Sequence, residues 1–104
     1  MAVASRPTLC DGVQVPYVTH ELFDLLRGLV DSVALVDEAT VRRAVAALAL
    51  KGKVVVEGSA ALALAAALND DDVAGRGAAP VAVVTGGSIE PAVFVDILKE
   101  ALPP

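Results

Sequence analysis

The stretch that decides the fold class is VAVVTGGS at residues 81–88. Its apolar residues form a continuous run, which is typical of a strand buried in a parallel sheet. Thr85, Gly86 and Gly87 follow, and we expect Ser88 to cap a helix. In open α/β sheets, ligands bind where strands end, and glycine and a helix N-terminus both favour a close polar contact. The junction therefore predicts a ligand site, with an ordinary tight turn as the alternative.

Outside this stretch, apolar residues at helical spacing alternate with short β-branched runs. The pattern predicts strands at Ser32–Val36, Val54–Val56 and Val81–Val84. It predicts helices over His20–Gly28 with Thr19 as the N-cap, after the N-cap Asp37, over Ala60–Leu68 and after Ser88. Strands that alternate with helices favour an α/β fold with short, at least partly parallel strands. We expect the acidic, glycine-rich segment from Asn69 to Pro80 to be a loop.

A second informative stretch is VVVEGSAALA at residues 54–63. It places the carboxylate of Glu57 between a valine run and a helix with no polar residue on any face. Such a helix is normally buried all round. Burying a charge costs free energy unless the charge is paired. Glu57 is therefore either stabilised by the dipole at the helix N-terminus or aimed at a ligand.

Composition excludes several classes of protein. The 104 residues are 56% hydrophobic and 20% charged, so the chain has ample apolar surface to fold. The longest apolar run, Ala60–Leu68, is about half the roughly 20 residues that a membrane span needs. The net charge of −5 disfavours nucleic acid and anionic membranes as partners. The single Cys10 and the lack of a signal-peptide pattern predict a reduced, cytoplasmic protein.

Other candidate residues carry less chemistry. His20 is expected on the surface and Cys10 as a small apolar residue, and no set of side chains has metal-ligand spacing. The mean hydropathy of +0.67 is high for so short a chain. That apolar surplus indicates either a dense core of small residues or a surface that a partner covers.

Five segments, taken in order, resemble the C-terminal part of fold-type-II pyridoxal-phosphate enzymes of the threonine/serine dehydratase and serine racemase group. They are Cys10–Val13, Val30–Val33, Asp37–Val41, Val56–Ala63 and Val83–Ile89. The resemblance implies that Thr85 hydrogen-bonds the pyridine nitrogen of the cofactor, that Gly86 and Gly87 keep the ring edge open, and that Glu57 lies in the polar network beside it. A neutral hydroxyl there makes the ring a milder electron sink, which suits β-elimination from a hydroxy amino acid.

The same resemblance implies what else the reaction needs. The family's cofactor-binding lysine and its phosphate-binding loop lie upstream of these motifs, and Lys51, Lys53 and Lys99 have other contexts. We therefore expect residues 1–104 to be a single partial domain of a threonine/serine ammonia-lyase, inactive alone. Its expected partners are the missing N-terminal segment or a complementing chain, a second copy, and a hydroxy amino acid as substrate. Ser88 and Gly58-Ser59 depart from the family pattern and leave the substrate preference open. The alternatives are a small non-catalytic α/β module that oligomerises and a free-standing ligand-binding domain.

Overall fold

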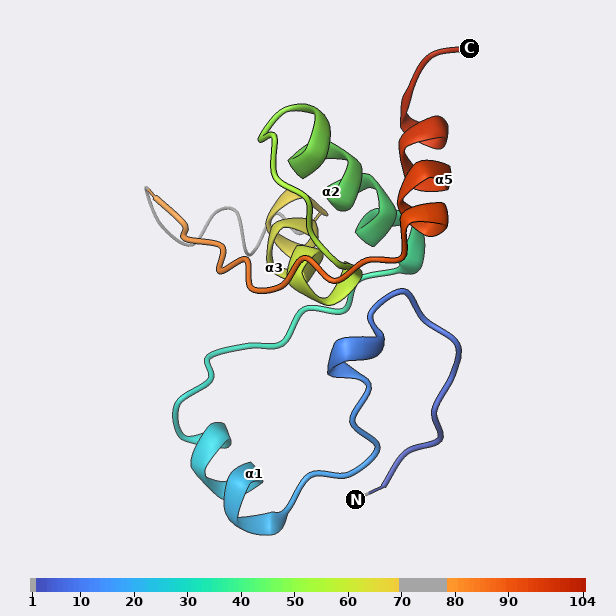
Figure 1. Ribbon diagram of the computed structural model, residues 1–104. Helices are drawn as coiled ribbons and strands as arrows, with labels where there is room; N and C mark the ends of the chain where they lie inside the picture. The colour runs from blue at the N-terminus through green and yellow to red at the C-terminus, as the bar shows by residue number, and fades with distance from the viewer. Residues whose placement is uncertain (1, 70–78) are drawn as a thin grey trace.

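The computed structural model describes residues 2–69 and 79–104, and the regular structure in these two ranges is helical. Within these ranges a short 3-10 helix is followed by four α-helices: η1 (Asp11–Val13), α1 (His20–Arg27), α2 (Glu38–Leu50), α3 (Gly58–Asn69) and α5 (Pro91–Ala101). Figure 1 shows α2, α3 and α5 gathered together, with α1 apart from them at the end of long connecting segments. Most of the predicted loop from Asn69 to Pro80 lies outside the described residues.

The starts of α1 and α2 confirm the predicted N-caps. The Thr19 hydroxyl accepts a hydrogen bond from the Leu22 amide at 3.3 Å, and the Asp37 carboxylate accepts one from the Thr40 amide at 2.7 Å. Each bond satisfies an amide that the first helical turn leaves without a backbone partner. Local signals were sufficient to place both helix starts.

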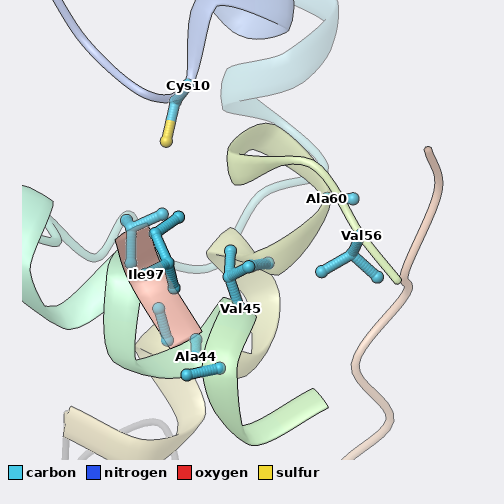
Figure 2. Close-up of a cluster of buried hydrophobic side chains, with 10 residues drawn as sticks. Cys10, Ala44, Val45, Val56, Ala60 and Ile97 are labelled. Carbon is cyan, nitrogen blue, oxygen red and sulfur yellow. The ribbon is translucent and has the colours of Figure 1, made fainter. Parts of the chain in front are cut away.

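The core lies between α2, α3 and the segments that flank them. Its buried side chains are mostly small, and the largest fully buried ones are Ile97, Val41, Val45 and Val56 (Figure 2). The alanines of α3 let it approach α2 closely, and Ile97 of α5 packs against the same cluster. Of the two explanations for the apolar surplus, a dense core of small residues is thus seen in this part of the chain.

The junction of α2 and α5 also carries a paired charge. The guanidinium of Arg42 donates two hydrogen bonds to the Glu100 carboxylate, at 2.9 and 2.6 Å. This pair raises the pKa of Arg42 and lowers the pKa of Glu100. Because the Glu100 carboxylate is largely solvent-exposed, the pair orients α5 more than it stabilises the fold.

The predicted strands are not confirmed. In residues 2–69 and 79–104 the only β-type pairing is an isolated bridge between Ala2 and Tyr17. The run Val81–Val84, expected to be buried, is exposed, with Val81 at 89%. A parallel strand is stable only beside another strand that takes its backbone hydrogen bonds, and the described chain supplies none to these segments. The expected α/β architecture is therefore seen only in its helices.

Two further expectations need correction. Ser88 does not cap the last helix, because α5 begins at Pro91 with Glu90 at the N-cap position, and proline favours the first helical position. The apolar helix α3 is not buried all round, since Leu68 near its C-terminal end is 67% exposed. No helix in the described part of the chain is long and apolar enough to cross a bilayer.

Many large apolar side chains lie on the surface, and most of them belong to α1 and its flanking segments. None of the α1 residues is buried, and Phe23 and Leu25 are each more than half exposed. The Cα radius of gyration of 15.0 Å exceeds the roughly 13 Å expected for about 100 residues folded compactly. The apolar surplus of the sequence is therefore divided between a small-residue core and an open surface around α1.

The cap of α2 gives a pH-dependent prediction. Hydrogen bonds to Thr40 lower the pKa of Asp37, so the folded state favours the ionised carboxylate more than the unfolded state does. That stabilisation is complete above the ordinary aspartate pKa of about 3.9 and is lost as the pH falls through the lowered value. Asparagine caps equally well without titrating. Urea unfolding below about pH 4 should therefore show a smaller loss of stability in Asp37→Asn than in the wild-type chain. The control Asp31→Asn should lose as much stability as the wild type, because Asp31 caps neither α1 nor α2.

Candidate functional site

The candidate site is centred on the carboxylate of Glu57, which stands directly before α3. This carboxylate reaches across to the turn at residues 85–88, where its Oε2 accepts a hydrogen bond from the Ser88 amide at 3.0 Å. The Glu57 amide donates to the Gly86 carbonyl at the same distance. Two stretches that the sequence marked separately are thus joined, and Figure 1 shows the segment before α5 passing beside the start of α3.

Glycines flank this carboxylate closely on two sides. A Cβ atom at Gly86 would lie 2.8 Å from Glu57 Oε2, and one at Gly12 would lie 3.1 Å from Oε1. A side chain at either position would displace the carboxylate from its present place. The η1 segment, the start of α3 and the turn before α5 therefore meet around one charged group.

Thr85 and its two glycines lie at the surface of this junction. The Thr85 side chain is exposed, Gly86 is half-buried and Gly87 is exposed. A Cβ atom at Gly87 would lie 2.9 Å from the Val55 carbonyl oxygen, so the turn packs closely on the segment that precedes Glu57. The turn thus offers a hydroxyl and an open backbone edge to an approaching molecule.

A cavity of about 180 Å³ lies beside the carboxylate. Three carboxylates, of Asp11, Glu57 and Glu90, line it together with apolar side chains that include Leu9 and Val93. This lining gives the cavity a negative potential, which favours cationic or neutral polar groups and disfavours a phosphate. In the described ranges no cluster of His, Cys, Asp and Glu side chains has the arrangement of a metal site.

Sequence reasoning missed the contacts of Gly12 and Ser59 in this junction and those of Glu38 beside it. The sequence marks Gly12 only as part of a turn and of a resemblance, yet Gly12 leaves the space in which Glu57 lies. Ser59 places its hydroxyl at 3.0 Å from a Cβ built on Gly12, and that buried oxygen has no hydrogen-bond partner among the described residues. Glu38 accepts hydrogen bonds from the Thr8 hydroxyl and the Leu9 amide, which ties the N-terminal segment to α2. None of these contacts has a signal in local spacing, because each joins segments far apart in the chain.

The other candidate residues lie where the sequence predicted. Cys10 is buried in the core, and its burial, assisted by Glu38, raises the pKa of the thiol and disfavours the reactive thiolate. His20 is exposed at the start of α1. Lys53 donates from Nζ to the Leu50 carbonyl at 2.6 Å, beside the end of α2. Lys51 and Lys99 are exposed, and none of the three lysines lines the cavity beside Glu57.

Comparison with known proteins adds an independent observation. The model of the pyridoxal-phosphate dependent enzyme family matches residues 1–86. An L-threonine ammonia-lyase of Thermotoga maritima is 35% identical over 100 residues, covering 96% of this chain and 24% of that protein. An L-threonine ammonia-lyase of Geobacter sulfurreducens is 40% identical over 85 residues, which cover 80% of this chain and 20% of that protein. The catabolic L-threonine dehydratase TdcB of Escherichia coli K12 is 37% identical over 86 residues, which cover 80% of this chain and 26% of that protein. The chain therefore spans about a quarter of the length of these curated relatives.

Proposed function

Because the chain belongs to the family of pyridoxal-phosphate dependent enzymes, we propose that it contributes one wall of the cofactor site in a threonine/serine ammonia-lyase. The chemistry proposed for the whole assembly is the loss of water from a hydroxy amino acid, followed by release of a 2-oxo acid and ammonia. L-threonine is the substrate in the names of the relatives above, and the proposal carries that substrate class to this chain.

The residues at the junction fit the edge of the cofactor ring. When bound, pyridoxal phosphate supplies an electron sink for bond breaking at the α-carbon of an amino acid. In this chain the Thr85 hydroxyl would hydrogen-bond the ring nitrogen without protonating it, and Gly86 and Gly87 would leave space for the ring edge. Glu57 would hold the polar wall beside the ring. The negative lining of the neighbouring cavity is unsuited to the phosphate of the cofactor, which another part of the assembly would hold.

One observation carries this proposal: the turn that contains Thr85 is joined to Glu57 by two hydrogen bonds, so the residues that the family resemblance singles out lie together. A catalytic role for the chain alone has no such support. Covalent chemistry on the cofactor needs a lysine nucleophile and a proton-transfer base, and the three lysines lie away from the cavity beside Glu57. We therefore propose that this chain acts with a segment that supplies the lysine and the phosphate loop, either an N-terminal segment of the same polypeptide or a complementing chain.

Co-expression tests this function. The chain should co-purify with a polypeptide that carries the lysine and phosphate loop of a family member, and the complex should bind pyridoxal phosphate and release ammonia and a 2-oxo acid from L-threonine or L-serine. The chain alone should form no borohydride-reducible bond with the cofactor and should release no ammonia. An absorbance band of a lysine–cofactor Schiff base on the isolated chain, lost together with activity when borohydride reduces the C=N bond, would overturn the requirement for a partner.

The exposed apolar side chains around α1 favour a second candidate, a non-catalytic module that assembles with further copies of itself. Burial of such surface is the main driving force for association. Light scattering separates the two functions. A dimer that is stable without cofactor and unchanged by the co-expressed polypeptide supports the module, whereas conversion to a hetero-complex supports the ammonia-lyase assembly.

A further inference from the structure

We propose that Glu57 is a positioning residue: its carboxylate fixes the turn at residues 85–88 for the ligand. The identity of the ligand rests on the proposed function. The contacts that define the role are present in this chain alone, so the two proposals can fail separately.

Glu57 holds the turn from both sides through two different groups. Its backbone amide donates to the Gly86 carbonyl at 3.0 Å, and its carboxylate Oε2 accepts from the Ser88 amide at 3.0 Å. Its own carbonyl accepts from the Ala61 amide at 3.2 Å, which fixes the residue to the first turn of α3. The orientation of the turn that follows Thr85 is thus set by a helix start that is itself anchored in the core.

The Glu57 carboxylate lies between two glycines, Gly86 and Gly12. Oε2 lies 2.8 Å from where a Gly86 Cβ would stand, and Oε1 lies 3.1 Å from where a Gly12 Cβ would stand. Both oxygens therefore face backbone that approaches closely on either side. This arrangement suits a group that spaces and orients two segments, and it leaves the exposed Thr85 hydroxyl as the group that meets a ligand.

The charge of Glu57 acts mainly through the Ser88 amide. In the described part of the chain, ion pairs join Arg27 to Asp24 and Arg42 to Glu100, and Glu57 is in neither. A hydrogen bond from an amide to a carboxylate is stronger than one to a neutral acceptor, so the ionised form holds the turn best. The turn is thereby ordered before the ligand arrives, which lowers the entropy that binding must overcome.

The test is nuclear magnetic resonance of the full chain without any cofactor. The amide proton resonance of Ser88 should lie at a different position in Glu57→Gln than in the wild-type chain, because a neutral amide oxygen is a weaker acceptor than a carboxylate. Glu57→Gln keeps the length of the side chain. Glu90→Gln is the matched control, because Glu90 lines the same cavity but has no hydrogen bond to Ser88 in the structure, and the Ser88 resonance should keep its wild-type position in it.

Amide hydrogen exchange measures the strength of the hydrogen bond between the Ser88 amide and the Glu57 carboxylate. Ser88 should exchange about tenfold faster in Glu57→Ala than in the wild-type chain, and Glu57→Gln should restore part of the protection because its amide oxygen can still accept. A Ser88 amide whose shift and exchange are the same in wild type and in Glu57→Gln would overturn the positioning role. So would a Ser88 resonance that moves as far in Glu90→Gln as in Glu57→Gln. Neither outcome bears on whether the complete assembly is an ammonia-lyase, which the co-expression experiment decides.

Discussion

Gly58→Ala is expected to lower the free energy of unfolding by about 1–3 kcal/mol or more, the range of over-packed cores. Gly58 is buried at the first position of α3, and a Cβ atom there would lie 2.5 Å from the Leu9 carbonyl oxygen and 2.8 Å from the Leu9 carbonyl carbon. Backbone atoms cannot rotate away as a side chain can. The N-terminal segment and the start of α3 would therefore have to separate, and urea unfolding followed by circular dichroism measures the cost.

A matched glycine serves as the control. Gly28 has right-handed backbone angles at the end of α1, and a Cβ atom there would lie 3.7 Å from the Leu25 carbonyl oxygen, which is ordinary contact. Alanine fits this conformation and restricts the unfolded chain, so Gly28→Ala should change stability little or raise it by about 0.4–1 kcal/mol. Equal unfolding midpoints for Gly58→Ala and the wild type would show that the close packing of Leu9 on α3 does not exist in solution.

The effect of Gly58 matters for the site because Glu57 precedes it. Any shift of the start of α3 moves the carboxylate that holds the Ser88 amide. Gly58→Ala should therefore also change the resonances of the turn at residues 85–88, which is distant in sequence. This coupling distinguishes loss of a specific junction from a general loosening of the core.

The helices could be predicted from sequence where the signal is local. Thr19 and Asp37 cap helices through bonds to amides three residues away, so spacing alone places both starts. Ser88 has the same side-chain chemistry and was predicted as a cap, but its amide is held by a residue 31 positions earlier and Pro91 sets the helix start. The cap signal is lost where a distant contact competes with it.

Strands could not be predicted on the same terms. The valine runs at residues 54–56 and 81–84 have the composition of buried strands, yet Val55 and Val83 are more than half exposed. Whether such a run pairs depends on which segments lie beside it, and composition contains no such information. The same limit applies to the site: the sequence marked Glu57 and Thr85 separately, whereas Gly12 and Ser59 became visible only when the structure placed them together.

Substitution of Thr85 is expected to have the second large effect, a loss of kcat/KM in the complex of this chain with a polypeptide that supplies the lysine. Thr85→Val keeps the volume of the side chain but removes the hydroxyl, which leaves the ring nitrogen without its proposed partner. An unsatisfied acceptor at a site closed to water costs about 1–3 kcal/mol, which corresponds to a loss of about 5- to 150-fold in kcat/KM for L-threonine. Thr85→Ser keeps the hydroxyl and should stay within about threefold of the wild type.

The same series separates chemistry from folding. Thr85 is exposed, so neither variant should change the urea midpoint of the isolated chain, and the Ser88 amide should keep its slow hydrogen exchange because Glu57 is untouched. The absorption spectrum of the bound cofactor should change in Thr85→Val and not in Thr85→Ser, since only the former alters the partner of the ring nitrogen. If Thr85→Val retains the spectrum and the kcat/KM of the wild-type complex, the ring nitrogen has another partner, and the turn serves only to close the wall that Glu57 holds in place.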